Sequence, residues 1–157
     1  EAGVATLRDY GFPESYVQKF APYLGKKRVE ADDFLKTHKL VLSQDEINTV
    51  NRLVMTQQAK DCIGRWDEQI ALIRKTNPRA PFFHEMSSTL QTIVFSRHYH
   101  QGPGWYQKDS NKAVYNAMLE NDWPTVKRQF RRLSSSSGPG WLRERFSKER
   151  DFLKDNS

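Results

Sequence analysis

The sequence predicts an all-α fold, and three observations support this prediction. Apolar residues recur at helical spacing along much of the 157 residues, and no stretch alternates apolar and polar residues at a period of two. Segments rich in proline, glycine or serine separate the apolar stretches. The content of 37% hydrophobic residues, with 9 Phe, 6 Tyr and 4 Trp, is enough to pack a core. We therefore expect one compact helical domain overall.

The first part of the chain predicts short helices separated by turns. Pro13 suits the first turn of a helix that runs to about Phe20, because an N–H at that position would have no partner in the helix. Pro22 and Gly25 end this helix, and a second helix is expected from about Val29 to Thr37. We expect residues 1–42 to form a helical lead-in and residues 43–157 to form the larger helical lobe.

The tetrapeptide Ser43-Gln44-Asp45-Glu46 is the clearest helix start in the sequence. The Ser43 hydroxyl can accept from the Glu46 N–H while the Glu46 carboxylate accepts from the Ser43 N–H, which is a capping box. Apolar residues then recur at helical spacing to about Lys75. We expect one long helix, or two end to end, with Gly64 as its weak point.

The next helix is expected to be the most buried one. No helix can cross the linker Asn77–Pro81 intact, because it contains two prolines. Apolar residues are frequent from Phe82 to about Tyr99, which is typical of a helix with a wide buried face. The segment Gln101–Gly104 contains two glycines and a proline and ends this helix.

Three more helices and a loop are expected in the remaining residues, and the first is a short helix capped by Ser110. Asp122 is a suitable N-cap, and Pro124 is tolerated in the first turn that follows it. Residues 134–140 are rich in serine and glycine, which predicts a flexible loop. A terminal amphipathic helix is expected from about Trp141.

Few residue patterns in this chain match those of catalytic or metal sites. His84-Glu85 begins a zinc-protease motif, but the second histidine is absent because position 88 is Ser88. His98 and His100 are two residues apart, which on a helix points them to different sides. Cys62, the only cysteine, is expected to be a core or half-buried residue. No metal and no organic cofactor is predicted.

Positive charge is concentrated in the last part of the sequence. The whole chain carries 25 Lys+Arg against 19 Asp+Glu, a net charge of +6. From Lys127 onward there are nine basic and four acidic residues, and nine minus four gives +5 for this segment. A basic face attracts polyanions, either nucleic acid or an anionic cell-wall polymer. A basic helical module that binds nucleic acid is therefore one candidate function, and a solvated face laced with ion pairs is the simpler explanation.

The segment Gln91–Gly102 has the sequence Gln-Thr-Ile-Val-Phe-Ser-Arg-His-Tyr-His-Gln-Gly. It resembles the central buried helix of phage-type lysozymes and, more closely, of the pesticin-like muramidase domains of bacterial toxins and secretion-system effectors. Other segments are similar to the family in the same order along the chain: Pro22–Lys27 with Ala31, Leu42–Glu46, Asn121–Trp123, and the terminal set Arg143, Arg145, Glu149 and Leu153.

The resemblance implies a phage-lysozyme-like helical lobe with a long connecting helix and a buried central helix. Residues 1–42 would then follow the family's active-site hairpin. The implied substrate is the glycan strand of peptidoglycan, whose MurNAc–GlcNAc β-1,4 bond the complete muramidases cleave. An immunity protein is an implied partner.

The family's cleft maps onto the end of the central helix, which implies five substrate-binding residues: Phe95, Ser96, Arg97, His98 and Tyr99. Tyr99 or His98 would stack on a sugar face, and Arg97 would meet a muramyl lactate or peptide carboxylate. For Phe95 the alternative is plain core packing.

The sequence departs from the family in its catalytic segment. Family enzymes carry a general-acid Glu within an E-G pair and a glycine-rich hairpin of the type T-I-G-x-G-x-D-L-G, and neither motif occurs here. No catalytic residue is therefore predicted, and little hydrolysis is expected from residues 1–157 alone. Two explanations stay open, a part of a larger toxin or effector and a degenerate domain that binds glycan without cutting it.

The sequence also carries an expectation about location. No apolar run approaches the roughly 20 residues that a membrane span needs, and no basic-then-apolar leader opens the sequence. The absence of a leader fits either a cytoplasmic protein or a domain that a larger toxin carries to the periplasm. The resemblance alone favours a parent protein that is secreted or delivered to the bacterial periplasm.

Overall fold

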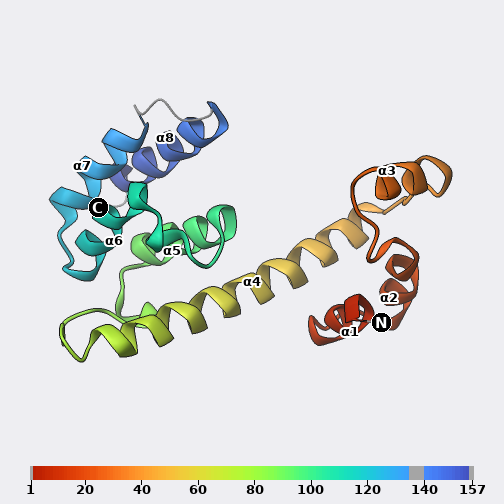
Figure 1. Ribbon diagram of the computed structural model, residues 1–157, viewed down its shortest axis with the longest axis horizontal. Helices are drawn as coiled ribbons and strands as arrows, with labels where there is room; N and C mark the ends of the chain where they lie inside the picture. Colours follow the sequence, from red (N-terminus) through yellow and green to blue (C-terminus); the bar gives the residue numbers. More distant parts are fainter. Residues whose placement is uncertain (1, 135–139, 156–157) are drawn as a thin grey trace. The chain divides into compact units, whose positions relative to one another are not determined.

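The computed structural model describes residues 2–134 and 140–155, and within these ranges it contains α-helices and 3₁₀ turns but no strand (Figure 1). The all-α prediction is confirmed. The predicted loop residues 135–139 lie outside the described residues, as do the side chains of Trp141 and Leu142. The helices are α1 (Ala2–Asp9), α2 (Glu14–Phe20), α3 (Arg28–Thr37), α4 (Gln44–Ile73), α5 (Ser88–Gln101), α6 (Asp109–Leu119), α7 (Trp123–Ser134) and α8 (Gly140–Asp155).

The chain divides into two compact units, Glu1–Ala59 and Lys60–Ser157. This division falls inside α4, whereas the sequence suggested a boundary between residues 42 and 43, at the start of that helix. The division into a lead-in and a lobe stays a prediction. No helix of the described residues combines the length and the hydropathy that a membrane span requires.

The first unit contains α1, α2, α3 and the beginning of α4, and its core is small. Phe12 and Val17 are buried, and the Phe12 ring meets the Phe20 ring edge to face with centroids 6.1 Å apart. Lys19 of α2 pairs with Glu46 of α4, with Nζ and Oε1 2.6 Å apart. These contacts hold α2 against the start of α4.

The predicted capping box at the start of α4 is confirmed. The Glu46 N–H donates to Ser43 Oγ at 3.2 Å, and the Ser43 N–H donates to Glu46 Oε2 at 2.8 Å. The ion pair with Lys19 and the hydrogen bond from the Ser43 N–H lower the pKa of Glu46, so its carboxylate stays charged for both roles. The helix continues through Gly64 without a break, so the weak point expected there does not interrupt it.

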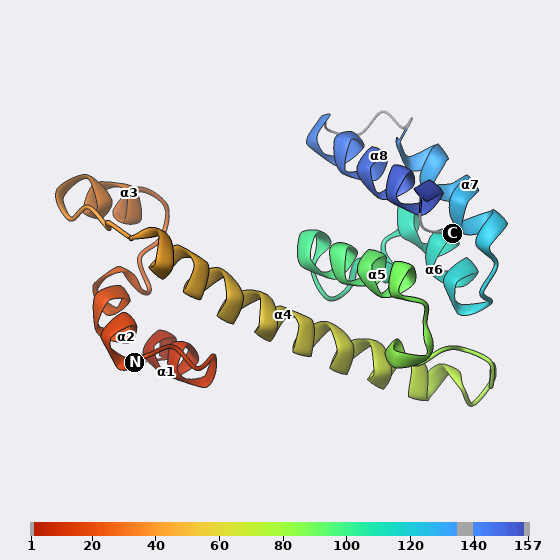
Figure 2. The same cartoon turned by 180° about the vertical axis from the view of Figure 1, so that it is seen from behind.

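The second unit contains the main core, with α5 between the end of α4 on one side and α6, α7 and α8 on the other (Figures 1 and 2). Trp66 of α4 meets Tyr115 of α6 edge to face with centroids 5.6 Å apart. The most deeply buried apolar residues come from all of these helices and include Ile70, Ile93, Val94, Val114, Met118, Val126, Phe130 and Leu153. The prediction of a buried central helix is confirmed.

The central helix begins six residues later than the sequence suggested. It was expected to start at Phe82, but α5 starts at Ser88, after a 3₁₀ turn over Phe83–Glu85. The Phe82 N–H donates to the Glu85 carboxylate at 2.8 Å, and the Phe83 N–H donates to Asp67 of α4 at 2.7 Å. Side chains therefore take the N–H groups of Phe82 and Phe83, and Ser87 caps the helix instead by accepting from the Leu90 N–H.

The predicted start of α7 is confirmed. Asp122 Oδ1 accepts a hydrogen bond from the Thr125 N–H at 3.1 Å, and Pro124 lies in the first turn. The Thr125 side chain and this backbone hydrogen bond both lower the pKa of the Asp122 carboxyl, as expected for an N-cap that acts as a carboxylate. The core side of α7 is formed by Val126, Phe130 and Leu133, all buried.

Cys62 lies in the core of the second unit with 2% of its surface exposed, as the sequence suggested. Burial, together with the nearby charge of Asp61, raises the pKa of its thiol to about 12. The thiolate is the reactive form, so native protein is expected to resist DTNB at about pH 8. Urea-unfolded protein should react through its one thiol and release one equivalent of thionitrobenzoate per chain under the same conditions. Rapid labelling of the native protein would contradict this burial.

Candidate functional site

The last two turns of α5 carry the five residues that the sequence suggested for substrate contact. The structure separates them by exposure. Ser96, Arg97 and His98 are buried, Phe95 is half-buried against the core, and Tyr99 is 46% exposed. Their role in substrate binding stays a prediction, and their contacts in the structure show what each can do.

Arg97 is 1% exposed and makes a buried ion pair with Glu149 of α8. Its Nη2 lies 3.0 Å from Glu149 Oε2, close enough for strong attraction although the pair lacks hydrogen-bond alignment. Its Nη1 donates to Asn111 Oδ1 of α6 at 3.0 Å. Burial lowers the pKa of Arg97 to about 10 against the raising effect of Glu149, so the guanidinium is still charged at neutral pH.

Two aromatic rings enclose the Arg97 guanidinium. Its central carbon lies 4.6 Å from the centroid of Phe130 and 4.2 Å from that of Phe146. Cation–π contacts of this kind are strongest where water is excluded. Arg97 therefore links α5 to α6, α7 and α8, and in this conformation its charge is directed into the protein.

Ser96 connects the buried pair of Arg97 and Glu149 to Arg145 nearer the surface, and these four residues form one cluster. The Ser96 hydroxyl donates to Glu149 Oε1 and accepts from Arg145 Nε at 3.1 Å. Arg145 also lies 3.4 Å from Glu149 Oε1, and its side chain is 34% exposed. Arg145 is thus the member of the cluster that reaches solvent.

A pocket of about 240 Å³ lies at this surface, lined by His100, Glu144, Arg145 and Lys148. Lys148 Nζ pairs with Glu144 Oε1 at 2.8 Å, and both side chains are exposed. Burial and the charge of Arg145 lower the pKa of His100, so the imidazole is neutral at pH 7. Lys148 and Arg145 therefore supply the positive charge of this pocket.

Aromatic side chains lie beside the pocket along the end of α5. The rings of Phe95 and Tyr99 have centroids 6.2 Å apart, and the Tyr99 ring meets the His100 imidazole edge to face at 5.0 Å. Of the five predicted residues, Tyr99 is the most exposed. An exposed ring next to a cationic pocket can hold a ligand with an apolar face and a carboxylate.

His98 has a different environment from its neighbours. Its Nε2 lies 2.9 Å from Asp61 Oδ2 of α4, and Asp61 Oδ1 accepts from Arg65 Nε at 2.8 Å. Burial by itself would raise the pKa of Asp61. The hydrogen bonds from Arg65 and His98 have a larger opposite effect, so the net result is a lowered pKa. His98 therefore fastens α5 to an ionised carboxylate of α4 within the second unit.

Comparison with known proteins shows the family to which the chain belongs. Residues 1–124 match the model of the pesticin family, described as a bacterial toxin homologue of phage lysozyme, C-terminal. The chain belongs to the pesticin family. The resemblance found in the sequence is confirmed, and with it the phage-lysozyme-like character of the helical fold. The searches of curated proteins and of solved structures gave no match.

The pesticin-family match ends at residue 124, so α8 is placed beside α5 by the structure rather than by the family model. Sequence reasoning missed the pocket that Lys148 and Arg145 form with His100. A signal was present, because Arg145 and Glu149, like Glu144 and Lys148, are four residues apart and share a helix face. The sequence did not reveal that His100 lies opposite that face.

Within the described part of this pesticin-family domain, no group of three or more His, Cys, Asp or Glu side chains is arranged to hold a metal ion. His84, which begins the incomplete zinc motif, stacks on the Phe82 ring with centroids 6.2 Å apart. Asp61 binds both His98 and Arg65. The site at the end of α5 offers an aromatic surface and fixed charges for binding.

Proposed function

We propose that this pesticin-family domain binds the glycan strand of peptidoglycan at the end of α5. The exposed Tyr99 ring, which meets His100 of the pocket that Arg145 and Lys148 also line, carries this proposal. A pyranose ring presents an apolar face of C–H groups that packs on an aromatic ring. The lactyl or peptide carboxylate of a muramyl unit would then meet the cationic pocket.

Residue roles follow from exposure and contacts. Tyr99 would stack on a sugar, with Phe95 supporting its ring from the preceding turn. Arg145 and Lys148 would take the carboxylate, which is the role first expected of Arg97. Ser96, Arg97 and His98 would act by positioning α5 through Glu149, Asn111 and Asp61.

The reaction of the complete domain would be hydrolysis of the MurNAc–GlcNAc β-1,4 bond. We propose that residues 1–157 bind this substrate with little hydrolysis, because the family's E-G pair and glycine-rich hairpin do not occur in them. The parent would be an antibacterial toxin or effector that acts in the periplasm, with an immunity protein as its natural inhibitor.

Tyr99→Ala is expected to weaken binding to insoluble peptidoglycan roughly fivefold, the size of a lost aromatic packing contact. Co-sedimentation with purified sacculi measures the dissociation constant, and loss of turbidity in the same samples reports hydrolysis. Tyr99→Phe keeps the ring and should retain binding.

Lys148→Gln tests the cationic pocket in the same assay, with Lys112→Gln as its matched control, an exposed lysine that is also paired on a helix. Equal binding by all four variants would contradict the proposed surface. Absence of sedimentation, with a steeply salt-dependent affinity for an oligonucleotide, would favour the nucleic-acid module. Robust lysis by residues 1–157 would overturn the proposal of binding with little hydrolysis.

A further inference from the structure

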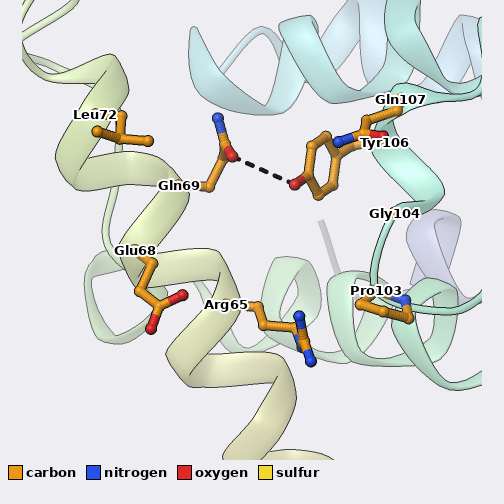
Figure 3. Close-up of a pocket in the computed structure, with 8 residues that line it drawn as sticks. All are labelled: Arg65, Glu68, Gln69, Leu72, Pro103, Gly104, Tyr106 and Gln107. Atoms are coloured by element: carbon orange, nitrogen blue, oxygen red, sulfur yellow. Dashed lines mark hydrogen bonds between the residues drawn. The ribbon is translucent and has the colours of Figure 1, made fainter.

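A second pocket lies on the second unit, between α4 and the turn that follows α5 (Figure 3). Its volume is about 280 Å³, which suits a side chain or a small head group. Arg65, Glu68 and Gln69 project from α4 on one side, and Tyr106 and Gln107 lie on the other, on the 3₁₀ turn Trp105–Gln107. The proposed glycan surface uses none of these residues.

The two charges of this pocket have opposite sign and come from one helix face. Arg65 and Glu68 are three residues apart on α4, and both side chains line the pocket. The Arg65 Nε–H donates to Asp61. The two terminal nitrogens of Arg65 donate no hydrogen bond to a described residue. Glu68 likewise has no ion pair or hydrogen bond with a described side chain. A ligand with one positive and one negative group would satisfy both.

The Arg65 side chain is held in place by a short chain of contacts. Asp61 binds Arg65 through Oδ1 at 2.8 Å and the buried His98 through Oδ2 at 2.9 Å. The lowered pKa of Asp61 keeps this carboxylate ionised. Arg65 thus presents its terminal nitrogens, a planar fork that suits the two oxygens of a carboxylate.

The opposite side of the pocket is rigid and partly aromatic. The Tyr106 ring stacks on Tyr115 with centroids 5.0 Å apart, and its hydroxyl donates to Gln69 Oε1 at 3.3 Å. The exposed Leu72 adds an apolar rim, while the Gln107 amide is available for a peptide group. Aliphatic carbons next to the charged groups of a ligand would fit against Tyr106 and Leu72.

We propose that this pocket binds the free amino-acid end of a peptidoglycan stem peptide, an ammonium and a carboxylate on one carbon. The carboxylate would pair with Arg65 and the ammonium with Glu68, while the methylene chain of a diaminopimelate residue packs on Tyr106. The choice of this ligand rests on the proposed function, because stem peptides are covalently attached to the glycan strand. The pocket would add recognition of the peptide to recognition of the sugar.

Isothermal titration with N-acetyl-L-Ala–γ-D-Glu–meso-diaminopimelate tests the proposal on residues 1–157. We expect saturable binding that Arg65→Gln and Glu68→Gln each weaken about tenfold or more, because each variant removes a charge-assisted contact. Lys60→Gln on α4 and Glu120→Gln after α6 are matched controls, exposed and outside the pocket, and should leave the affinity unchanged.

Modified peptides assign each contact. Acetylation of the free diaminopimelate amine should weaken binding to the unmodified protein about tenfold and have little effect on Glu68→Gln. Amidation of the adjacent carboxylate should likewise weaken binding to the unmodified protein about tenfold and have little effect on Arg65→Gln. A general loss of structure in either variant would not produce this pairing. Absence of peptide binding, or equal sensitivity of all variants to both modifications, would overturn the proposal.

Peptide-free glycan strands separate this inference from the proposed function. If such strands bind the protein with Tyr99 dependence while the peptide does not bind, the stem-peptide pocket is wrong and the glycan surface stands. If the peptide binds with the expected pairing while the strands do not, the pocket stands and the glycan surface is wrong. If neither ligand binds, both are wrong.

Discussion

Glu149→Gln is expected to lower the free energy of unfolding by about 3–5 kcal/mol, the usual cost of leaving a buried charge without its partner. Glu149 is 6% exposed and balances Arg97, which is 1% exposed. The amide keeps the size of the side chain but removes the negative charge next to Arg97 and Arg145. Urea denaturation followed by circular dichroism measures this loss.

Glu144→Gln is the matched control for Glu149→Gln. Glu144 lies on the same helix and is also paired four residues away, with Lys148, but its side chain is 68% exposed. Exposed pairs of this kind contribute about 0.5 kcal/mol or less. Adding Arg97→Met to Glu149→Gln should recover part of the stability, because it removes the uncompensated charge. Equal destabilisation by the two single variants would contradict the buried ion pair.

Trp105→Ala is expected to cost about 3–5 kcal/mol of unfolding free energy, because a large buried ring is replaced by a cavity. Trp105 is 2% exposed, and its ring meets Tyr106 and Tyr115 edge to face with centroids 6.2 Å and 5.9 Å away. The loss should also loosen Tyr106 and weaken peptide binding in the adjoining pocket. Circular dichroism is the suitable probe, since the variant removes a tryptophan.

Leu72→Ala is the control for the loss of Trp105. Leu72 is 58% exposed on α4, so its truncation removes little buried surface and should change stability by about 0.5 kcal/mol or less. Trp105→Phe keeps an aromatic ring and should cost less than Trp105→Ala. If Trp105→Ala unfolds at the same urea concentration as Leu72→Ala, the core described for the second unit is wrong.

The starts of α4 and α7 were predictable because the cap and its partner lie within one turn. The Ser43 and Glu46 capping box and the Asp122 cap use bonds between residues three apart, so the sequence alone contains both partners. The start of α5 was placed too early, although its cap Ser87 and the Leu90 N–H are also three residues apart. Asp67, on another helix, accepts from the Phe83 N–H and helps to hold that segment out of the helix.

In the candidate site, too, some features were predictable from the sequence and others were not. The sequence alone determined an all-helical chain, its main caps, its family resemblance and the segment that ends α5. Only the tertiary structure decided which side chains on that segment meet solvent. A charged residue such as Arg97 is costly to bury unless a partner compensates it, and its partner Glu149 lies 52 residues away on α8. Local sequence cannot specify such a contact, whereas packing α8 against α5 turns Arg97 inward and leaves Tyr99 exposed.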